Sequence, residues 1–487
     1  MAKTKVVRRL PIARDLAMPD IARMDEARAR CRQHFALHGY DEIETPLLEQ
    51  TELFLRKSGG ELASRLYAFT DPGGYQVSLR PEFTAPVIRH VIEEVATRGV
   101  TLRYHYSGPV FRYPSSGTTS SSDLAIFTQA GAELVGGSAP DGDGEVIAMA
   151  WSGLGELGVP SPTVAIGHVG LLWELLRPYG LSDRAQLFLV QSVGRLRGGE
   201  RAKREVRAQA SEIGLLRNGR NGDRVAAGGA TTEVLPEAPV EIVESLLSRT
   251  LGGPLGQVAG ARTPDEIMAR LARKLQTIDD ERAFDAALAY VSNLAVVRGP
   301  LGEALKRGRG IAKAARQHAG PFEALQDVVE SAVSRGVPGN AITVDLGLAR
   351  DIAYYTGSVF DLGSSESAAS YGGGGRYDGL MNSLGAGADI AASGFAYNLD
   401  AVVAASDTIE APPKQARVAV APALRDAAAR AALEAAAAYA GKLRAEGKAA
   451  ILIPAGEAAA LKRAAKAAGA GVIVVVGGDG RARASRP

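Results

Sequence analysis

The sequence lacks the residues that would support a disulfide or a metal cluster. Cys31 is the single cysteine among 487 residues, and the six histidines are scattered without metal-ligand spacing. No apolar run is long enough to cross a bilayer, and the basic N-terminal stretch has no apolar core of the kind that a signal peptide needs. We therefore expect a soluble, cytoplasmic protein that binds no metal and carries no cofactor.

A strong net charge and an internal repeat are lacking too. Lys and Arg number 56 against 54 Asp and Glu, which gives a net charge of +2. Hydrophobic residues make up 46% and charged residues 23%, which is typical of globular proteins. The net charge therefore gives no sign of a nucleic-acid partner, although a local patch could still bind tRNA. The length allows two or three domains.

The first part of the chain alternates between helix and strand patterns. Apolar residues at steps of three and four predict an amphipathic helix that ends near Gly39. "YDEIETPLLE" follows as a strand closed by Pro46, and a hairpin with its turn at Asp71 to Gly74 leads into another helix. The stretch from Gly108 to Gly136 then predicts two paired strands joined by a loop of Ser, Thr and Gly. The helix residues are Ile21, Met24, Ala27, Cys31 and Phe35.

The rest of the chain divides into three segments by its composition. Residues 181–339 are Ala-rich and charged, and we interpret them as a mainly helical insertion. Strand patterns return in residues 340–405, where Ile342, Val344 and Leu346 alternate. A Pro-containing linker follows, and residues 415–487 predict the order β-α-β-α-β of a small α/β domain. Residues 1–180 and 340–405 would then form the two halves of one α+β core.

Many polar side chains lie on strands whose apolar faces must be buried. A buried charge costs several kcal/mol unless it is paired, so such a set indicates a solvated cavity of ligand size. Carboxylates, guanidiniums and phenols together suit a small zwitterion, although the same groups could instead pair among themselves as ordinary salt bridges. The candidates are Glu82, Arg112, Gln129, Glu133, Arg350, Tyr354, Tyr355, Arg376 and Tyr377.

Two further stretches have simpler interpretations. "YGGGGRYDGL" lacks the ending of a phosphate-binding loop, so its glycines indicate close backbone approach to a ligand or a strand. The basic stretch "GRLRGGERAKREVRAQ" could contact nucleic acid, but the interleaved Glu200 and Glu205 favour a solvated helix face.

Five blocks of the sequence resemble the class II histidyl-tRNA synthetase family. They are "GYDEIETP", "RPEFTAP", "GPVFRY…FTQAGAELVG", "LARDIAYYTGSVF" and "GGGGRYDGL", and the last two resemble the histidine-specific signatures of that family. The resemblance covers residues 10–180 and 335–405. It implies a class II aminoacyl-tRNA synthetase-like antiparallel sheet that binds histidine, ATP and, in true synthetases, tRNA. The C-terminal domain resembles an anticodon-binding domain only in outline.

The resemblance also implies a role for each candidate residue. Glu82 and Thr84 would hold the ammonium group of the amino acid, with Gln129 nearby. Arg350 would face the histidine carboxylate, and Arg112 the α-phosphate of ATP. The imidazole contacts and the pocket wall would come from Glu133, Tyr354, Tyr355 and Tyr377.

The sequence departs from the synthetase pattern in the half of the site that would hold ATP. Pro114 stands where a Glu is expected after the "FR" pair, and a Ser/Thr-rich loop from Ser115 to Asp123 replaces a loop rich in Arg and Gln. Ala125 and Ala401 stand where the family has arginines. Adenylyl transfer needs charge stabilisation at the phosphates, and the loss of one such donor typically costs about 100- to 1000-fold in rate. We therefore expect almost no adenylation and no catalytic residues of its own.

One relative in this family fits that pattern, the regulatory subunit of ATP phosphoribosyltransferase, which serves in histidine biosynthesis. The resemblance then implies a chain that binds free histidine and forms a homodimer within a hetero-oligomer. Its partner would be the short-form catalytic subunit, which it regulates allosterically. A divergent histidyl-tRNA synthetase, which would bind tRNA, remains the alternative, because Arg112 and Arg350 are retained. A synthetase paralogue with another role, such as amino-acid modification, also remains open.

Overall fold

The computed structural model contains two compact units. They are Met1–Glu410 and Ala411–Pro487. The structure describes residues 7–10, 12–56, 62, 64–98, 101–113, 125–216, 279–350, 354–410, 416–423 and 429–487. None of the helices in these ranges is long and apolar enough to cross a membrane.

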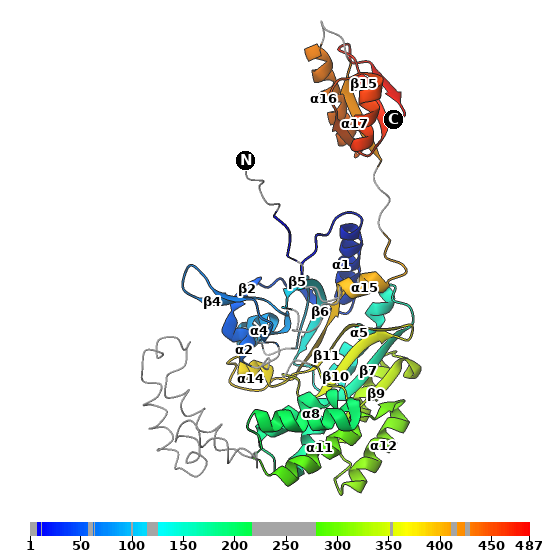
Figure 1. Ribbon diagram of the computed structural model, residues 1–487. Helices are drawn as coiled ribbons and strands as arrows, with labels where there is room; N and C mark the ends of the chain where they lie inside the picture. Colours follow the sequence, from blue (N-terminus) through cyan, green and yellow to red (C-terminus); the bar gives the residue numbers. More distant parts are fainter. Residues whose placement is uncertain are drawn as a thin grey trace. The chain divides into compact units, whose positions relative to one another are not determined.

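The first unit is built on a nine-stranded, mainly antiparallel sheet (Figure 1). All neighbours from β5 to β7 in the sheet order are antiparallel, while β1 on β5 and β9 on β7 are parallel. The predicted α+β class with a class II-like antiparallel core is confirmed. The strands in sheet order are β1 (Asp41–Glu42), β5 (Leu102–Phe111), β6 (Ile126–Val135), β12 (Ala392–Asn398), β11 (Ser367–Arg376), β10 (Ser358–Ser364), β7 (Pro162–His168), β9 (Ile342–Asp345) and β8 (Arg298–Gly299).

Helices α1 (Asp20–Leu37) and α5 (Asp141–Glu156) pack on one face of this sheet. The buried face of α1 includes Met24, Ala27, Cys31 and Phe35, four of the five positions that predicted this helix. The helix stops just before Gly39, whose φ of +79° suits a residue without a side chain. The predicted helix and its end are therefore both found.

The segment predicted as a single strand after Gly39 is instead two short strands in different sheets. β1 ends at Glu42, and β2 (Leu48–Gln50) pairs with β4 (Gln76–Leu79) of a small three-stranded sheet completed by β3 (Ala68–Thr70). Pro46 lies between the two pieces and has no N–H to donate to a ladder, which explains the interruption. The hairpin turn is found as predicted, with Gly74 N–H donating to the Asp71 carbonyl oxygen over 3.0 Å.

The described part of residues 181–339 is helical except for β8, and residues 217–278 lie outside the described ranges. Leu189, Phe284 and Leu325 on these helices belong to the same apolar core as Val344 of β9, so the helices share the core of the sheet. Figure 1 shows α8, α11 and α12 grouped beside the strands β7 and β9. The α-helices described within residues 181–339 are α7 (Asp183–Ser192), α8 (Gly199–Glu212), α11 (Glu281–Ala295), α12 (Leu301–Ala314) and α13 (Phe322–Ser334), and α6 (Val169–Leu176) precedes them.

The basic stretch on α8 is neutralised by acidic neighbours. Arg201 pairs with Glu205 at 2.8 Å, and Arg207 pairs with Glu281 and Asp285 at 3.0 and 2.7 Å. These pairs are largely solvent-exposed, which agrees with the interpretation of a solvated helix face.

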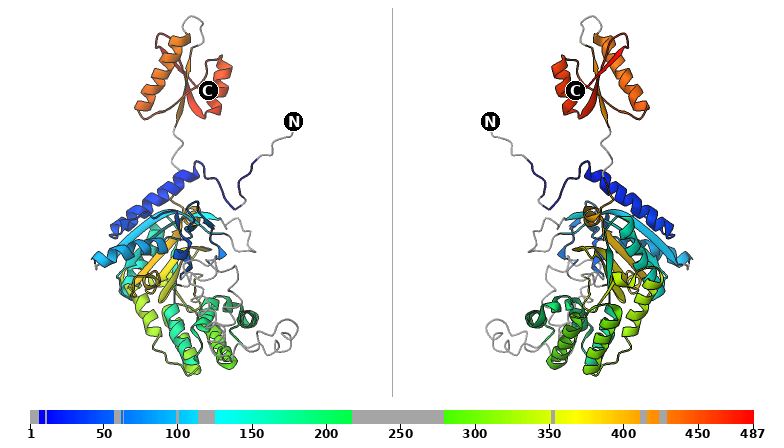
Figure 2. Two further views of the ribbon diagram at one scale, coloured as in Figure 1. Left: turned by 90° about the vertical axis from the view of Figure 1, so that its left-hand side faces the viewer. Right: turned by 90° about the vertical axis from the view of Figure 1, so that its right-hand side faces the viewer.

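The second unit is a small α/β domain. Its sheet has the order β14-β13-β15-β16, in which the first three strands are parallel and β16 is antiparallel to β15. The sequence indicated three strands and two helices, and the exposed β16 was not predicted because it has no apolar pattern. Figure 2 shows α16 and α17 on opposite sides of this sheet, each over its own apolar cluster. The elements are β13 (Arg417–Pro422), α16 (Ala429–Ala445), β14 (Ala449–Leu452), α17 (Ala458–Ala467), β15 (Ala470–Val476) and β16 (Ala482–Ser485).

Candidate functional site

A cavity of about 370 Å³ lies on the face of the large sheet that is turned away from α5. Tyr397 of β12 points to α5, where its hydroxyl donates to the Ala150 carbonyl oxygen over 2.7 Å. Its neighbour Ala396 lines the cavity, because successive residues of a strand point to opposite faces. Eight of the ten residues that the sequence suggested for a ligand site line this cavity, namely Glu82, Thr84, Arg112, Gln129, Arg350, Tyr354, Tyr355 and Tyr377.

One row of paired residues runs across five strands beneath the cavity, and all of its members except Gly131 line the cavity. Tyr106 of β5 lies opposite Gly131 of β6, which lies opposite Ala396 of β12. Ala396 in turn faces Gly373 of β11, which faces Asp361 of β10. The three middle positions are Gly or Ala, so the side chains are small at the centre of the row and large at its two ends, Tyr106 and Asp361. The small residues let other side chains approach the sheet closely, because an added Cβ would lie 2.7 Å from the Tyr106 hydroxyl at Gly131 and 2.1 Å from Arg350 Nη1 at Gly373.

One end of the cavity presents acceptors suited to an ammonium group. Glu82 is 3% exposed, and its carboxylate accepts the Ala85 N–H at the start of α4 (Thr84–Arg98), over 3.1 and 3.2 Å to its two oxygens. Burial raises the pKa of Glu82, while the Ala85 N–H and the charge of Arg112 oppose that shift. Gln129 is 8% exposed, and its buried side-chain oxygen has no hydrogen-bond partner among the residues that the structure describes. An acceptor that is buried and unsatisfied requires a donor, which a ligand ammonium would supply.

Glu133 is, with Arg376, one of the two candidate residues that do not line the cavity. It lies behind the wall, where its carboxylate accepts hydroxyl hydrogens from Thr84 over 2.7 Å, from Tyr106 over 2.9 Å, and from Tyr377. All three donors line the cavity themselves. Burial raises the pKa of Glu133 to about 8, and the three hydroxyls oppose that rise. Glu133 therefore does not face the cavity, but its hydrogen bonds fix the orientation of the three side chains that do.

Four aromatic side chains form that wall. Tyr354 contacts Tyr355 and Tyr377 with ring centroids 4.9 and 5.5 Å apart. Tyr106 stacks on Phe83 at 4.3 Å, with the two rings nearly parallel. Burial raises the pKa of all four tyrosines above the ordinary value, so their hydroxyls stay protonated near neutral pH and can donate.

The side chain of Arg350 lies along the strands β10 and β11, at one end of the cavity. Its Nη1 donates to Asp361 Oδ1 over 2.9 Å and to the Phe360 carbonyl oxygen over 3.2 Å, and Ser370 Oγ donates to the same Asp361 oxygen over 2.8 Å. A Cβ on Gly373 would lie 2.1 Å from that Nη1, so the guanidinium rests directly on the glycine backbone. The glycine run of β11 therefore permits close approach, as the sequence indicated.

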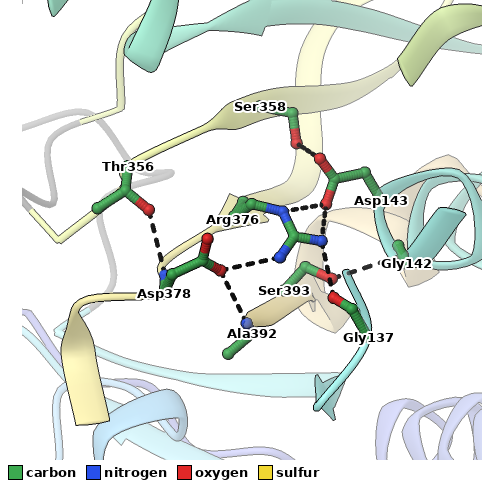
Figure 3. A network of polar contacts seen from close by, with 9 residues as sticks. All are labelled: Gly137, Gly142, Asp143, Thr356, Ser358, Arg376, Asp378, Ala392 and Ser393. Carbon is green, nitrogen blue, oxygen red and sulfur yellow. Dashed lines mark hydrogen bonds and ion pairs between the residues drawn. The ribbon is translucent and has the colours of Figure 1, made fainter. Parts of the chain in front are cut away.

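Arg376 was also a candidate, but it belongs to a buried structural network away from the cavity (Figure 3). Its Nε donates to Asp143 Oδ1 of α5 over 2.7 Å, and its Nη1 donates to Asp378 Oδ1 over 2.8 Å. Ser358 Oγ donates to the other Asp143 oxygen over 2.8 Å. For Arg376 the ordinary salt-bridge interpretation therefore holds.

Two of the positions that depart from the synthetase pattern lie in the described residues. Ala125 is 2% exposed, its N–H donates to the Ile12 carbonyl oxygen over 3.0 Å, and its own carbonyl oxygen accepts the Arg112 N–H over 2.9 Å. Ala401, in the first turn of α15 (Leu399–Ala405), packs against the main core. Neither residue lines the cavity. Pro114 and the loop Ser115–Asp123 lie outside the described residues.

Sequence reasoning missed four polar residues of the cavity, Tyr106, Asp361, Ser370 and Arg65. Tyr106 could have been found, because it is six residues before Arg112 on the same strand pattern and so points to the same face. Asp361 and Arg65 carry no comparable local signal. The described ranges contain no group of three or more His, Cys, Asp or Glu side chains placed to hold a metal ion.

The family model described as histidyl-tRNA synthetase matches residues 12–215 and 240–402. The histidine–tRNA ligase of Methanocaldococcus jannaschii is 27% identical over 383 residues, 78% of this chain and 71% of that protein. An ATP phosphoribosyltransferase regulatory subunit of Allorhizobium ampelinum is 30% identical over 371 residues, 76% of this chain and 94% of that protein.

A crystal structure from Bacillus halodurans, described as an ATP phosphoribosyltransferase regulatory subunit/histidyl-tRNA synthetase, shares the fold. Its TM-score is 0.62 at 22% identity, over 98% of this chain and all of that one. The family model covers well over half of the residues, including both halves of the sheet that carries the cavity. This chain therefore belongs to the histidyl-tRNA synthetase family.

Proposed function

We propose that this chain is the regulatory subunit of ATP phosphoribosyltransferase, and that it binds histidine in the cavity without adenylating it. The observation that carries the proposal is a difference between the two halves of the site. The half that would hold the amino acid keeps its binding residues, whereas the half that would hold ATP lacks arginines at two positions. The amino-acid half keeps Glu82, Thr84 and Gln129 at one end and Arg350 at the other. The two described positions at which the family has ATP-binding arginines are Ala125 and Ala401.

The amino-acid half suits a zwitterion with a polar ring. Glu82 and the unsatisfied Gln129 oxygen would accept from the ammonium group, and Arg350 would donate to the carboxylate. Between these two ends lie the hydroxyls of Tyr106, Tyr355 and Tyr377. Those of Tyr106 and Tyr377 donate to Glu133 and can still accept from an imidazole N–H, while that of Tyr355 can donate to the other ring nitrogen. An aliphatic amino acid could not donate to the Tyr106 and Tyr377 oxygens or accept from the Tyr355 hydroxyl, which supports histidine as the ligand.

The packing of the two alanines supports the absence of adenylation. Ala125 is buried and fixed on both sides by backbone hydrogen bonds, and Ala401 packs its small side chain against the core. Neither position supplies a cation to the phosphates. Since each missing donor typically costs about 100- to 1000-fold in rate, the loss of two leaves little capacity for adenylyl transfer.

The regulatory-subunit relative supports the partner that we propose, the short-form catalytic subunit of ATP phosphoribosyltransferase. That relative matches this chain over 94% of its own length. We propose that a homodimer of this chain assembles with the catalytic subunit, and that histidine shifts the complex between two states. Histidine must then have different affinities for those states.

The alternative is a divergent histidyl-tRNA synthetase. Arg112 and Arg350 in the cavity favour it, as do relatives such as the archaeal ligase described above. Under this alternative the chain would bind tRNA and charge it with histidine.

Two measurements separate the two functions. Histidine-dependent exchange of pyrophosphate into ATP would be measured on the purified chain, and we expect none above background. The chain would also be co-expressed with a short-form catalytic subunit, and phosphoribosyl transfer assayed with and without histidine. We expect a stable complex that is more active than the short enzyme alone and is inhibited by histidine. Robust exchange together with no association would reject the regulatory function and favour the synthetase.

A further inference from the structure

Asp361 places a carboxylate in the part of the cavity that would hold the carboxylate of the ligand. It lines the cavity together with Arg350, and its Oδ1 lies 2.9 Å from Arg350 Nη1. Under the proposed function Arg350 donates to the ligand carboxylate. Two negative charges, one of the protein and one of the ligand, would then share a single guanidinium, and like charges at this range repel each other.

The position of Asp361 is fixed by its strand and by a second hydrogen bond. β10 lies between β7 and β11 in the sheet, and Asp361 is paired with Ala165 on one side and with Gly373 on the other. Ser370 Oγ donates over 2.8 Å to the same Asp361 oxygen that accepts from Arg350. Because a strand in the interior of a sheet holds its side chains in place, we expect Asp361 to stay beside the guanidinium when a ligand binds.

Arg350 is fixed beside Asp361 by contacts of its own. Its Nη1 also donates to the Phe360 carbonyl oxygen over 3.2 Å, and the guanidinium rests on the backbone of Gly373. A ligand carboxylate must therefore approach Arg350 where it already lies. The two carboxylates would then be separated by about the width of one guanidinium.

Folding stability does not account for the pair of Arg350 and Asp361. Their side chains are 25% and 35% exposed, and ion pairs with that much solvent contact contribute little to the stability of a fold. The pair of Arg376 and Asp143, which joins β11 to α5, is only 5% and 1% exposed. The contrast indicates that Asp361 acts on the ligand rather than on the fold.

We infer that Asp361 is a specificity-determining residue of the cavity, which competes with the ligand carboxylate for Arg350 and so lowers the affinity for amino acids relative to amino alcohols. The inference rests on the proposed function for the identity of the ligand. Because Asp361 does not repel a neutral hydroxyl, the competition acts only on a ligand that carries a carboxylate. It keeps the affinity for histidine below the value that Arg350 alone would give, so the ligand leaves when its concentration falls.

The test compares histidine with histidinol, in which a CH2OH group replaces the carboxylate, by calorimetry on the full chain. In Asp361→Asn the amide oxygen can still accept from Arg350 and Ser370, while the negative charge is gone. We expect histidine to bind about three- to tenfold more tightly to this variant, from the repulsion of two unit charges across one guanidinium in a partly exposed site. Histidinol should bind no more tightly than it does to the unchanged chain.

Further variants separate the charge of Asp361 from its structural contacts. Asp361→Ser, which is shorter and neutral, should also favour histidine over histidinol. Glu366→Gln removes the same charge from the turn between β10 and β11, where Glu366 accepts from Ser161 over 2.8 Å away from the cavity lining. This control should leave both dissociation constants unchanged. The melting temperature of the unliganded Asp361→Asn chain should not rise, so tighter binding would not come from a more stable fold.

A purely structural Asp361 predicts the opposite result, because the loss of a support for Arg350 would weaken histidine binding. Weaker histidine binding to Asp361→Asn, or equal changes for histidine and histidinol, would overturn the inference and leave the proposed function in place. If histidine does not bind, the proposed function fails, and the comparison is repeated with whichever standard amino acid raises the melting temperature and with its amino alcohol. A gain for that amino acid alone still supports the inference. If no amino acid binds to either chain, the inference fails together with the proposed function.

Discussion

The Tyr377 hydroxyl donates a hydrogen bond to the buried carboxylate of Glu133, which joins the segment after β11 to β6 behind the wall of the cavity. Tyr106 and Thr84 donate to the same carboxylate, so three cavity residues take their orientation from one acidic group. The geometry of the wall therefore depends on a residue that lies outside the cavity.

Removal of one of these donors should weaken both the fold and the site. Tyr377→Phe leaves Glu133 with two donors, and above about pH 8, where Glu133 is ionised, the loss of a hydrogen bond to a charged group costs about 1.5–3 kcal/mol. We expect a lower urea midpoint and weaker histidine binding, with Tyr75→Phe as the matched control because Tyr75 is 63% exposed. Equal midpoints for the Tyr377→Phe variant and the unchanged chain would contradict this role.

The stability of the chain should depend on pH through Glu133. Its pKa is raised to about 8 in the folded chain by burial, so the folded state retains a proton that the unfolded state loses near the ordinary value. The free energy of unfolding should therefore fall as pH rises from about 5 to 8, by up to about 1.4 kcal/mol per pH unit from this group. Chemical unfolding of Glu133→Gln at several pH values should show a flatter profile. If the free energy of unfolding changed with pH equally in the variant and in the unchanged chain, Glu133 would not be the source of the pH dependence.

The contact between Gly373 and Arg350 predicts a site-specific glycine effect. Gly373→Ala places a Cβ 2.1 Å from Arg350 Nη1 and 2.3 Å from the Phe360 carbonyl oxygen, so both strand and guanidinium must shift. We expect lower stability and weaker binding of histidine. Gly310→Ala is the control, because Gly310 lies within α12 with no atom close to an added Cβ, and it should be stabilising by about 1 kcal/mol. Similar melting temperatures for Gly373→Ala and Gly310→Ala would contradict the close contact between Gly373 and Arg350.

The buried oxygen of Gln129 predicts that the ligand must carry an amine. Imidazolepropionate, which is histidine without its α-amino group, leaves both Gln129 and Glu82 without that donor. A charged hydrogen bond of about 1.5–3 kcal/mol corresponds to roughly 10- to 100-fold in affinity. Calorimetry with the two ligands checks this expectation, and equal affinities would place the amine elsewhere.

Arg376 should be essential for the fold rather than for the ligand. Arg376→Met leaves Asp143 buried without its counter-charge, and breaking a buried pair in this way costs about 3–5 kcal/mol. The double variant Arg376→Met with Asp143→Asn removes both charges and should recover part of the loss. If the double variant melts no higher than the single one, the pair does not account for the effect.

The sequence by itself determined the elements with a clear period and the residue types of the site. The apolar spacing of α1, the hairpin at Asp71–Gly74 and the alternation in β9 are local patterns, and local backbone geometry fixes which face each residue takes. The polar residues on buried strands indicated a cavity for the same reason, since charge on a buried face requires a ligand or a partner.

Only the tertiary structure decided which of these polar residues face the cavity. Glu133 and Arg376 have the same local signature as Gln129 and Arg350, yet one lies behind the wall and the other in an ion-pair network with α5. Asp361 and Arg65 became visible as site residues only through strand register and through the pairing of residue 65 with Tyr113. Register and partners are set by contacts between segments far apart in the chain, so no local pattern in the sequence could specify them.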